Sequence, residues 1–421
     1  MPMYPAKRFR RGKNGERKQA TKKQIRSVTG VKDFEAVLAL PQRLIEVLQL
    51  LFGVTPAMWN FALDKIRQGM AYKIWFRSKG PGKPRRKISA PCDELKAVQA
   101  LILHRFLREI PVHLVRESNR AGTSIVTNAT AHASARAVFS LDLVDAFPSV
   151  WRSRVRAVLS GPLHGTIERQ FPGETFTDED LGKLLESMLD LLMLNDRLPQ
   201  GPPSSPRILD LCLFSADTQL FQLIRASSSA LQKYRLTGYA DDYTISSDQE
   251  IPETMRGAIV EILTTLGWRV HTSEAKTHYM SPAVGEVPVV TGLVISPDGR
   301  ITMAPRKVNQ IRARLYQLLK LPEWDVELRG EAAGLSGYVQ SIYGEKPPSE
   351  LRVYVEQTRN RMTRAVVDFV VPPDPAEPPA PKPKKERKGK RTKNGTPPPP
   401  DGVVETSNDV ETVNAVNTMA R

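Results

Sequence analysis

The amino-acid sequence predicts an α+β protein, and three observations carry this prediction. Segments with strand composition lie among helical segments without the regular strand–helix alternation of a parallel sheet. Two adjacent acids interrupt an apolar, β-branched run in "LTGYADDYTISS", residues 236–247, which indicates strand, turn and strand. Residues 178–194, "DEDLGKLLESMLDLLML", place apolar side chains at helical spacing behind acids that suit a helix N-terminus. A chain of 421 residues can bury a large core around such elements.

The first half of the chain is predicted to consist of a basic arm followed by helices. Residues 1–30 contain ten Lys or Arg and one acid, which indicates an arm without regular structure. Residues 35–70 carry apolar spacing that suits helices, and residues 92–110 read as helical again. Between these helical regions, residues 78–90 predict two strands joined by a turn at residues 80–82, "GPG".

That strand pair lies in an unusually basic stretch. Residues 65–91 hold nine Lys or Arg and no acid, and Tyr72, Trp75 and Phe76 are interleaved among them. Basic residues interleaved with aromatic ones inside a folded region favour a nucleic-acid-binding surface.

The second half alternates irregularly between strands and helices. The elements that we expect are a strand within residues 135–147, a helix over 206–224, the strand pair 234–247, a helix over 254–267, a strand pair over 287–296 and a helical region over 305–344. The helix over 206–224 should bury one face that comprises Leu209, Cys212, Leu213, Ala216 and Leu220. From about residue 371 the chain is rich in Pro and Lys and then polar, which predicts a disordered tail.

The formal net charge of +16 is unevenly distributed. Residues 1–30 contribute +9, residues 382–393 contribute +7, and the rest of the chain sums to zero. Such basic segments favour polyanions, nucleic acid first, although they could serve solubility alone. Cys92 and Cys212 are too few and too far apart for a disulfide framework or a zinc site, so we expect a reducing compartment, the cytoplasm. No uncharged apolar run approaches the ~18 residues of a membrane span, so no membrane association is expected.

The paired acids Asp241 and Asp242 indicate a metal site. Two like charges at a tight turn repel, so either one carboxyl is protonated or a cation lies beside them. Mg²⁺ prefers carboxylates together with substrate phosphates. Asp142, at the end of another apolar strand, would complete a site for two Mg²⁺ ions about 3.5–4 Å apart if the two strands are neighbours. The alternative for an isolated pair of acids is an exposed turn.

These segments resemble the palm motifs of reverse transcriptases in order and spacing. The resemblance rests on "LDLVDAFPS" at 141–149, "LPQGPPSSP" at 198–206, "YADD" at 239–242 and "EAKTHYM" at 274–280. Residues 85–103 resemble the fingers segment that precedes the palm. The Ala-Asp-Asp turn, and the two-residue gap between Asp142 and Asp145, favour a DNA-synthesising enzyme over a viral RNA-dependent RNA polymerase. The resemblance covers residues 40–345 and implies RNA-templated dNTP addition, with an RNA–DNA hybrid as product.

Two further matches resemble the signatures of bacterial retron reverse transcriptases. They are "NATAH" at 128–132 and "VTG" at 290–292. Members of that group bind a dedicated structured non-coding RNA, prime from a guanosine 2′-OH within it, and make a branched RNA–DNA molecule (msDNA) used in antiphage defence, in some cases with an effector protein. Two alternatives stay open: a related defence-associated or abortive-infection enzyme with protein-primed or untemplated synthesis, and an RNA-binding scaffold whose polymerase site has decayed.

The resemblance also implies a right-hand architecture of fingers, palm and thumb. The expected regions are a basic arm at 1–30, fingers at 31–125, palm at 126–300, thumb at 301–370 and a Pro/Lys-rich disordered tail at 371–421.

By the same resemblance, four side chains and one carbonyl would carry the chemistry. Asp142, Asp241 and Asp242, with the backbone carbonyl of Leu143, would hold the two Mg²⁺ ions. Lys276 would protonate the leaving pyrophosphate.

Other residues would bind the incoming nucleotide or the RNA. Asp145 and Ala146 would offer backbone N–H groups to the triphosphate, although a second aromatic residue is common at the position of Ala146. Phe147 would exclude a 2′-OH by its bulk. Gln200 and Gly201 would line the nucleotide pocket, the glycine because the backbone must approach the substrate closely.

The triphosphate clamp and the first retron signature complete the expected site. Arg86 would clamp the triphosphate from the fingers, with Lys79 or Lys83 as further donors. Asn128 and His132 would brace the fold or contact RNA.

Overall fold

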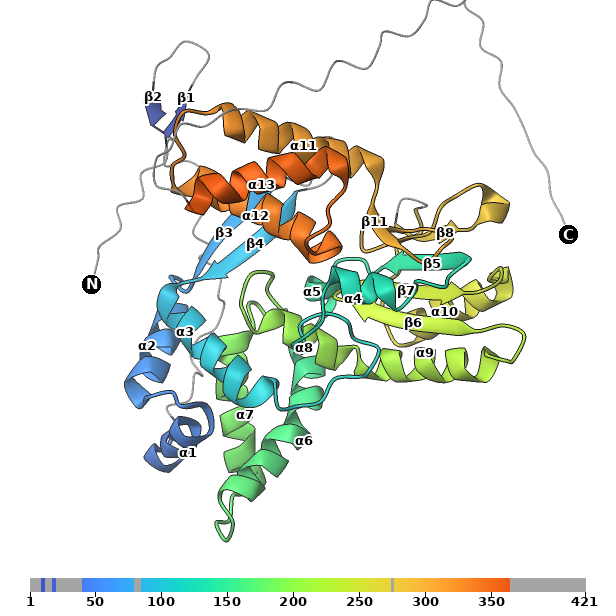
Figure 1. Ribbon diagram of the computed structural model, residues 1–421. Helices are drawn as coiled ribbons and strands as arrows, with labels where there is room; N and C mark the ends of the chain where they lie inside the picture. The colour runs from blue at the N-terminus through green and yellow to red at the C-terminus, as the bar shows by residue number, and fades with distance from the viewer. Residues whose placement is uncertain (1–8, 12–16, 20–39, 79–84, 274–275, 364–421) are drawn as a thin grey trace, which may run out of the picture. The chain divides into compact units, whose positions relative to one another are not determined.

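The computed structural model describes residues 9–11, 17–19, 40–78, 85–273 and 276–363. The chain separates into two units, residues 1–371 and 372–421, and all described residues belong to the first. Helices and antiparallel sheets follow one another irregularly along this unit, which confirms the predicted mixture of helices and strands (Figure 1). The predicted tail lies outside the described residues.

Within the N-terminal arm, where no regular structure was expected, the structure describes two three-residue strands. Strands β1 (Phe9–Arg11) and β2 (Arg17–Gln19) pair antiparallel, with Phe9 opposite Gln19. The other residues of the arm, 1–8, 12–16 and 20–30, lie outside the described residues.

The next elements are α1 (Gln42–Phe52), α2 (Pro56–Arg67), β3 (Tyr72–Arg77), β4 (Arg86–Pro91), α3 (Asp93–Ile102), the π-helical turn η2 (Leu103–Leu107) and α4 (Ile125–Thr130). Helices α1 to α3 lie where helices were predicted, whereas β3 precedes the predicted range 78–90 and α4 was not predicted. Apolar residues of α1, α2 and α3 are buried in one large core. The predicted turn between β3 and β4 lies outside the described residues.

A four-stranded antiparallel sheet forms the centre of the described unit. It comprises β5 (Ala137–Asp142), β6 (Tyr234–Tyr239), β7 (Asp242–Ser247) and β8 (His278–Met280), in the order β6-β7-β5-β8. Helix α9 (Phe214–Ser227) packs against β6, and α10 (Glu253–Thr265) packs against α9 (Figure 1). Alternate strand residues, including Leu141, Tyr243 and Ile245, are buried in the large core. Their neighbours along each strand therefore point to the opposite face.

Two helical segments depart from the sequence analysis. The single helix expected over 206–224 is two helices, α8 (Ser205–Cys212) and α9, which meet at Leu213. The predicted apolar positions are nevertheless all buried, because both helices face the same core. Helix α6 (Arg152–Gln170) was not predicted, because it contains Pro162. A proline inside a helix removes a backbone hydrogen bond and clashes with the preceding turn. The core contacts of α6 repeat every four residues from Val155 to Ile167.

The remaining elements of this region are short or were expected. They are α5 (Ala146–Ser149), α7 (Asp178–Leu192) and the 3-10 turn η3 (Pro282–Val284). The Thr177 side chain caps α7 in a reciprocal box with Asp180, so the acids do lie at its N-terminus.

The C-terminal elements form a second core. Strands β9 (Val289–Val290), β10 (Leu293–Ile295) and β11 (Ile301–Met303) make a three-stranded sheet, followed by α11 (Pro305–Lys320), α12 (Val326–Tyr343) and α13 (Ser349–Thr363). Helix α13 was not predicted. Ala129 of α4, Val138 of β5 and Met280 of β8 belong to the same core, so α4 and the central sheet pack against these elements.

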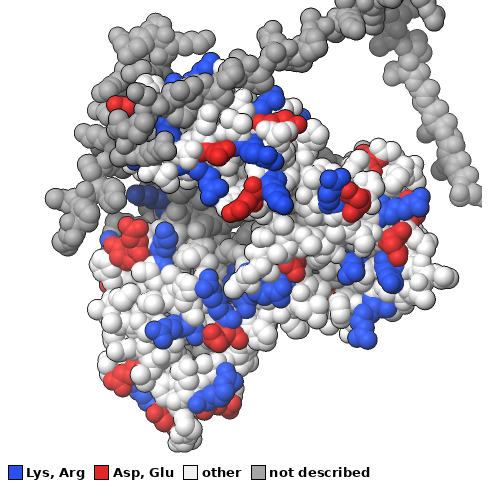
Figure 2. Space-filling view, in the orientation of Figure 1, with Lys and Arg blue, Asp and Glu red and all other residues white. Residues whose placement is uncertain are grey.

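Charge on the described surface is mixed. On the face shown in Figure 2, basic and acidic side chains are interspersed, as expected for a body whose charge sums to zero. Within the described ranges, no single helix is long and apolar enough to cross a membrane; α1 and α2 pass such a test only as a pair, bent by 101°.

Candidate active site

The central sheet brings the three predicted acids to one end. Strands β5 and β7 pair so that Asp142 lies directly opposite Asp242. Asp241 lies in the two-residue turn between β6 and β7, and its backbone carbonyl accepts a hydrogen bond from the Leu143 N–H at 3.1 Å. Strand pairing alone therefore makes neighbours of residues about a hundred positions apart in sequence.

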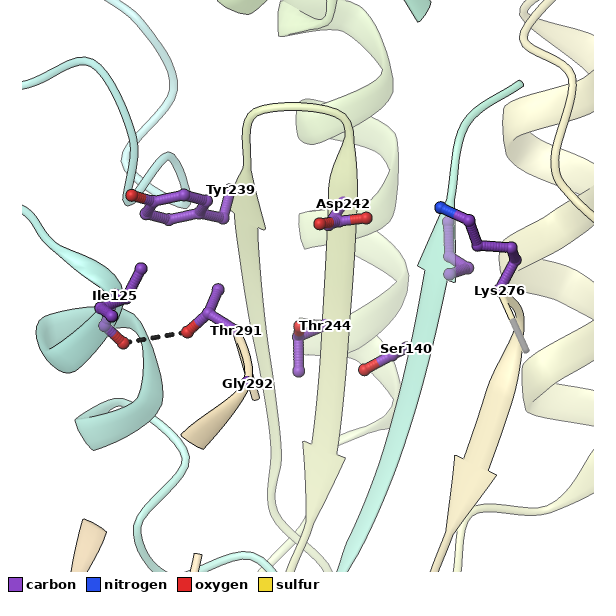
Figure 3. A pocket seen from close by; sticks show the side chains of 9 residues that line it. Ile125, Ser140, Tyr239, Asp242, Thr244, Lys276, Thr291 and Gly292 are labelled. Atoms are coloured by element: carbon purple, nitrogen blue, oxygen red, sulfur yellow. Dashed lines mark hydrogen bonds between the residues drawn. The ribbon is translucent and has the colours of Figure 1, made fainter. Parts of the chain in front are cut away.

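The charges of this acidic end are only partly compensated. Asp142 is 7% exposed and forms an ion pair with the Lys276 ammonium group. Asp242 lies at the surface of a cleft, where desolvation by the surrounding protein and the adjacent charge of Asp241 raise its pKa to about 6 (Figure 3). Among the described residues, no three or more His, Cys, Asp or Glu side chains converge closely enough to hold a metal ion.

The loop after β5 is fixed by backbone hydrogen bonds. The Val144 N–H donates to the Arg269 carbonyl at 2.8 Å, and the His271 N–H donates to the Asp142 carbonyl at 3.0 Å. Asp145 then adopts a positive φ of 48° and begins α5, which contains Ala146 and Phe147. The half-buried Phe147 ring packs against the large core.

Gln200 and Gly201 lie against strand β4 rather than alone in a loop. The Ser89 N–H donates to the Gln200 carbonyl at 2.7 Å. Gly201 has a φ of +140°, and a Cβ there would lie 2.4 Å from the Ser89 carbonyl oxygen. We expected glycine at this position because of a close substrate; the close neighbour found is the β4 backbone. The loop is thereby joined to the strand that carries Arg86.

The β3–β4 hairpin adds a residue that the sequence analysis missed. Arg77 pairs directly with Arg86, so both exposed guanidinium groups lie on the same face, which the exposed Trp75 also shares. Like charges directly opposite each other destabilise a hairpin, unless an anion lies between them. The two-residue side-chain period of a strand could have identified Arg77. Lys79 and Lys83 lie outside the described residues.

Helix α4, which carries the start of the first retron-like segment, packs against strands β9 and β10 on either side of the second. The Thr291 hydroxyl donates to the carbonyl of Ile125, three residues before the first segment, at 2.9 Å (Figure 3). A cleft of about 380 Å³ lies between Ile125, Thr291 and the central sheet, and Figure 3 shows Asp242 and Lys276 at its rim. Its lining comprises Ile125, Ser140, Leu141, Tyr239, Asp242, Thr244, Lys276, Thr291 and Gly292.

His132 and Asn128 are both fully buried. The His132 ring nitrogens hydrogen-bond the hydroxyls of Ser246 at 2.6 Å and Thr237 at 2.8 Å, and burial lowers the pKa of His132 to about 4. The Asn128 amide has no hydrogen-bond partner within the described part of the chain. His132 therefore braces the β6–β7 hairpin, which fits the first of the two roles we expected.

The chain belongs to the reverse transcriptase (RNA-dependent DNA polymerase) family, whose model matches residues 77–311. The matched range contains every candidate acid and both arginines of the hairpin.

Its curated relatives narrow the resemblance to retron enzymes. The Retron Mx162 reverse transcriptase of Myxococcus xanthus is 29% identical over 72% of this chain and 64% of that protein. The Retron Mx65 reverse transcriptase of the same species is 27% identical over 67% and 63%. The Retron Ec86 reverse transcriptase of Escherichia coli is 29% identical over 59% and 70%. The chain thus spans a little under two thirds of the length of the first two relatives. A solved telomerase from Candida albicans aligns with a TM-score of 0.34 at 12% identity, over 67% of this chain and 54% of that chain.

Proposed function

We propose that this chain is an RNA-directed DNA polymerase that adds dNTPs at the acidic end of its central sheet. The observation that carries the proposal is the register of β5 and β7, which sets Asp142 opposite Asp242, with Asp241 in the adjoining turn. Three carboxylates on neighbouring strand ends are the groups that metal-dependent nucleotidyl transfer requires. In this proposal the central sheet belongs to the palm, the β3–β4 hairpin to the fingers, and α11–α13 to the thumb.

The acids suit Mg²⁺ by their chemistry. Carboxylate oxygens are its preferred protein ligands, and Asp242 lies opposite Asp142 with Asp241 in the adjoining turn. Asp142, Asp241, Asp242 and the Leu143 carbonyl would hold two ions, for which the Asp142 carboxylate would leave its ion pair with Lys276 and the three acids would turn closer together than they lie here. When bound, Mg²⁺ activates the primer hydroxyl and compensates the charge of the triphosphate.

The surrounding residues would orient the nucleotide. Arg77 and Arg86 would bind the triphosphate with two forked guanidinium groups, where an anion would also relieve their mutual repulsion. Gln200 and Gly201, joined to the same hairpin through Ser89, would line the base and sugar pocket.

On the other side of the nucleotide, three residues would face the sugar and triphosphate. Asp145 and Ala146 would offer backbone N–H groups to the triphosphate, and Phe147 would exclude a 2′-OH. Lys276 would hold a proton at Nζ for the leaving pyrophosphate.

The finer proposal is a retron-type role. The relatives are retron reverse transcriptases, and Thr291 and Gly292 of the second signature line a cleft beside Asp242, together with Ile125 of the helix that leads into the first. We therefore propose that the enzyme acts in the cytoplasm on a dedicated structured RNA and extends a primer held in this cleft to make msDNA. In this proposal the enzyme contributes to antiphage defence together with an effector protein.

A primer-extension experiment tests the polymerase proposal. The purified chain, with oligo(dT)-primed poly(rA), Mg²⁺ and dTTP, should extend the primer, and Asp241→Asn should abolish extension while RNA binding and melting temperature stay unchanged. Asp248→Asn, an exposed acid after β7, is the matched control and should keep its activity. Near wild-type extension by Asp241→Asn would refute the assignment.

A second experiment addresses the retron role. RNA that copurifies with the chain should be one structured species, and the DNA made on it should be covalently linked to that RNA. DNA linked to protein, or made without a template, would favour the alternative modes of synthesis. An RNA bound without any DNA synthesis would favour a scaffold.

A further inference from the structure

The strand that leads to the acidic turn is flanked by a segment with no role in the site described above. The Gly238 N–H of β6 donates to the Val115 carbonyl at 2.8 Å, and the Glu117 N–H donates to the Gly238 carbonyl at 2.8 Å. Arg116 therefore lies beside Gly238 in a parallel bridge at the outer edge of the central sheet. Residues 115–117 therefore flank β6 on its free edge, whereas Asp142 lies on β5, two strands away on the other side.

The turn itself contains a residue in an unfavourable conformation. Ala240 has a φ of +53°, whereas hairpin turns with a positive φ at this position favour glycine. Both of its backbone groups are held from outside the hairpin. The Ala240 N–H donates to the Ser118 hydroxyl at 2.8 Å, and the Ala240 carbonyl accepts from Arg116 Nη1 at 2.8 Å. The left-handed conformation, which costs about 1–3 kcal/mol, is thus imposed by residues 116 and 118.

The Arg116 guanidinium is fixed on all sides. It is fully buried, and Nε donates to Asp217 Oδ2 at 2.7 Å, while Nη2 contacts Asp217 Oδ1. Asp210 lies 3.9 Å from Nη1. Gly238 makes room for the guanidinium, because a Cβ there would lie 2.9 Å from Arg116 Cζ. A buried ion pair of this kind adds little stability over an apolar replacement, so stability alone does not account for Arg116 at this position.

The same guanidinium also reaches the far side of the acid pair. Nη2 donates to the Tyr243 hydroxyl, which in turn donates to Asp217 Oδ1 at 2.6 Å. Tyr243 directly follows Asp242 and points to the face opposite it, into the core. Ala240 and Tyr243 bracket the two acids, and both are tied to one buried group.

We propose that Arg116 is a positioning residue, which clamps the chain on both sides of Asp241 and Asp242 and so fixes these carboxylates relative to Asp142. This inference rests on the proposed polymerase function of the three acids. Displacing a reacting group by about 1 Å costs on the order of 100-fold in rate, so loosening the clamp should act mainly on kcat.

Arg116→Lys is the informative variant, since it keeps the charge opposite Asp217 but loses the fork. We expect kcat for dTTP incorporation on primed poly(rA) to fall by ~10- to 100-fold, with KM for dTTP and RNA affinity nearly unchanged. Arg207→Lys is the matched control. Arg207 is also a buried arginine that donates to backbone carbonyls, but to those of Leu107, Arg108 and Ile110. This control should lower the melting temperature similarly while keeping kcat.

Two further readouts keep the test decisive. Amide hydrogen exchange should rise over residues 236–247 in Arg116→Lys and over residues 103–112 in Arg207→Lys. If Arg116→Lys does not fold, Tyr243→Phe removes one anchor without stranding a charge, and it should lower kcat several-fold.

The failures of the two proposals are distinguishable. A wild-type chain without polymerase activity refutes the proposed function. If the wild type is active, two results refute the clamp alone. One is an unchanged kcat in Arg116→Lys, or in Tyr243→Phe if Arg116→Lys does not fold. The other is an equal fall of kcat in Arg116→Lys and Arg207→Lys.

Discussion

Acid should weaken this fold through His132, which is buried between two hydroxyl groups of the central hairpin. The folded pKa of about 4 lies below the ~6.5 of an unfolded histidine, so the unfolded chain binds the extra proton. The contribution of His132 to stability is therefore fully present above about pH 6.5 and is lost as the pH falls toward 4. At 1.36 kcal/mol per pKa unit, His132 lowers the free energy of unfolding by about 3 kcal/mol over the whole window and by about 2 kcal/mol at pH 5.

Urea denaturation at about pH 7.5 and about pH 5 gives the free energy of unfolding of wild type and of His132→Gln at each pH. Carboxylates also titrate over this range, so the relevant quantity is the pH-dependence of wild type minus that of His132→Gln. Glutamine retains a polar partner for one hydroxyl but cannot titrate. We expect wild type to lose ~2 kcal/mol more than His132→Gln, while the exposed His104→Gln behaves as wild type. Equal losses in wild type and His132→Gln would show that the buried imidazole carries no such linkage.

Three other perturbations test separate parts of the molecule. Phe147→Ala should increase rNTP incorporation relative to dNTP, and an unchanged ratio in a competition assay would remove Phe147 from that role. Gly201→Ala should destabilise the chain by at least about 2 kcal/mol in urea denaturation, because the new Cβ meets the Ser89 carbonyl; Gly292→Ala has a positive φ but open space, so it should cost less. Deleting residues 1–30 and 382–393, which hold the net charge, should lower affinity for any RNA by a similar factor and flatten its salt dependence by about 0.7–0.9 for each phosphate that is no longer neutralised. Preference for cognate over scrambled RNA should survive this deletion, and its loss would mean that these segments recognise the RNA.

Local patterns were sufficient for much of the fold. The hairpin around Asp241 and Asp242 was predictable because apolar and β-branched residues flank a polar turn. Helix α7 was predictable because its N-terminal acids and its apolar residues at helical spacing both indicate a helix over the same range. Helix α6 was missed because Pro162 resembles a helix breaker, although packing of a buried stripe outweighs its cost. The break at Leu213 was missed because one apolar face runs through both helices.

Motif order and spacing, which are properties of the chain, were sufficient to predict the family of this protein and to nominate candidate site residues. Which of these candidates are neighbours depends on the tertiary structure. The pairing of β5 with β7 sets Asp142 opposite Asp242, and the contact between Gly201 and Ser89 joins two distant motifs. The burial of Arg116 behind the turn had no local signal at all, since an arginine is ordinarily exposed and its partner Asp217 lies about a hundred residues away. Such contacts arise from long-range packing, which no short window of sequence records.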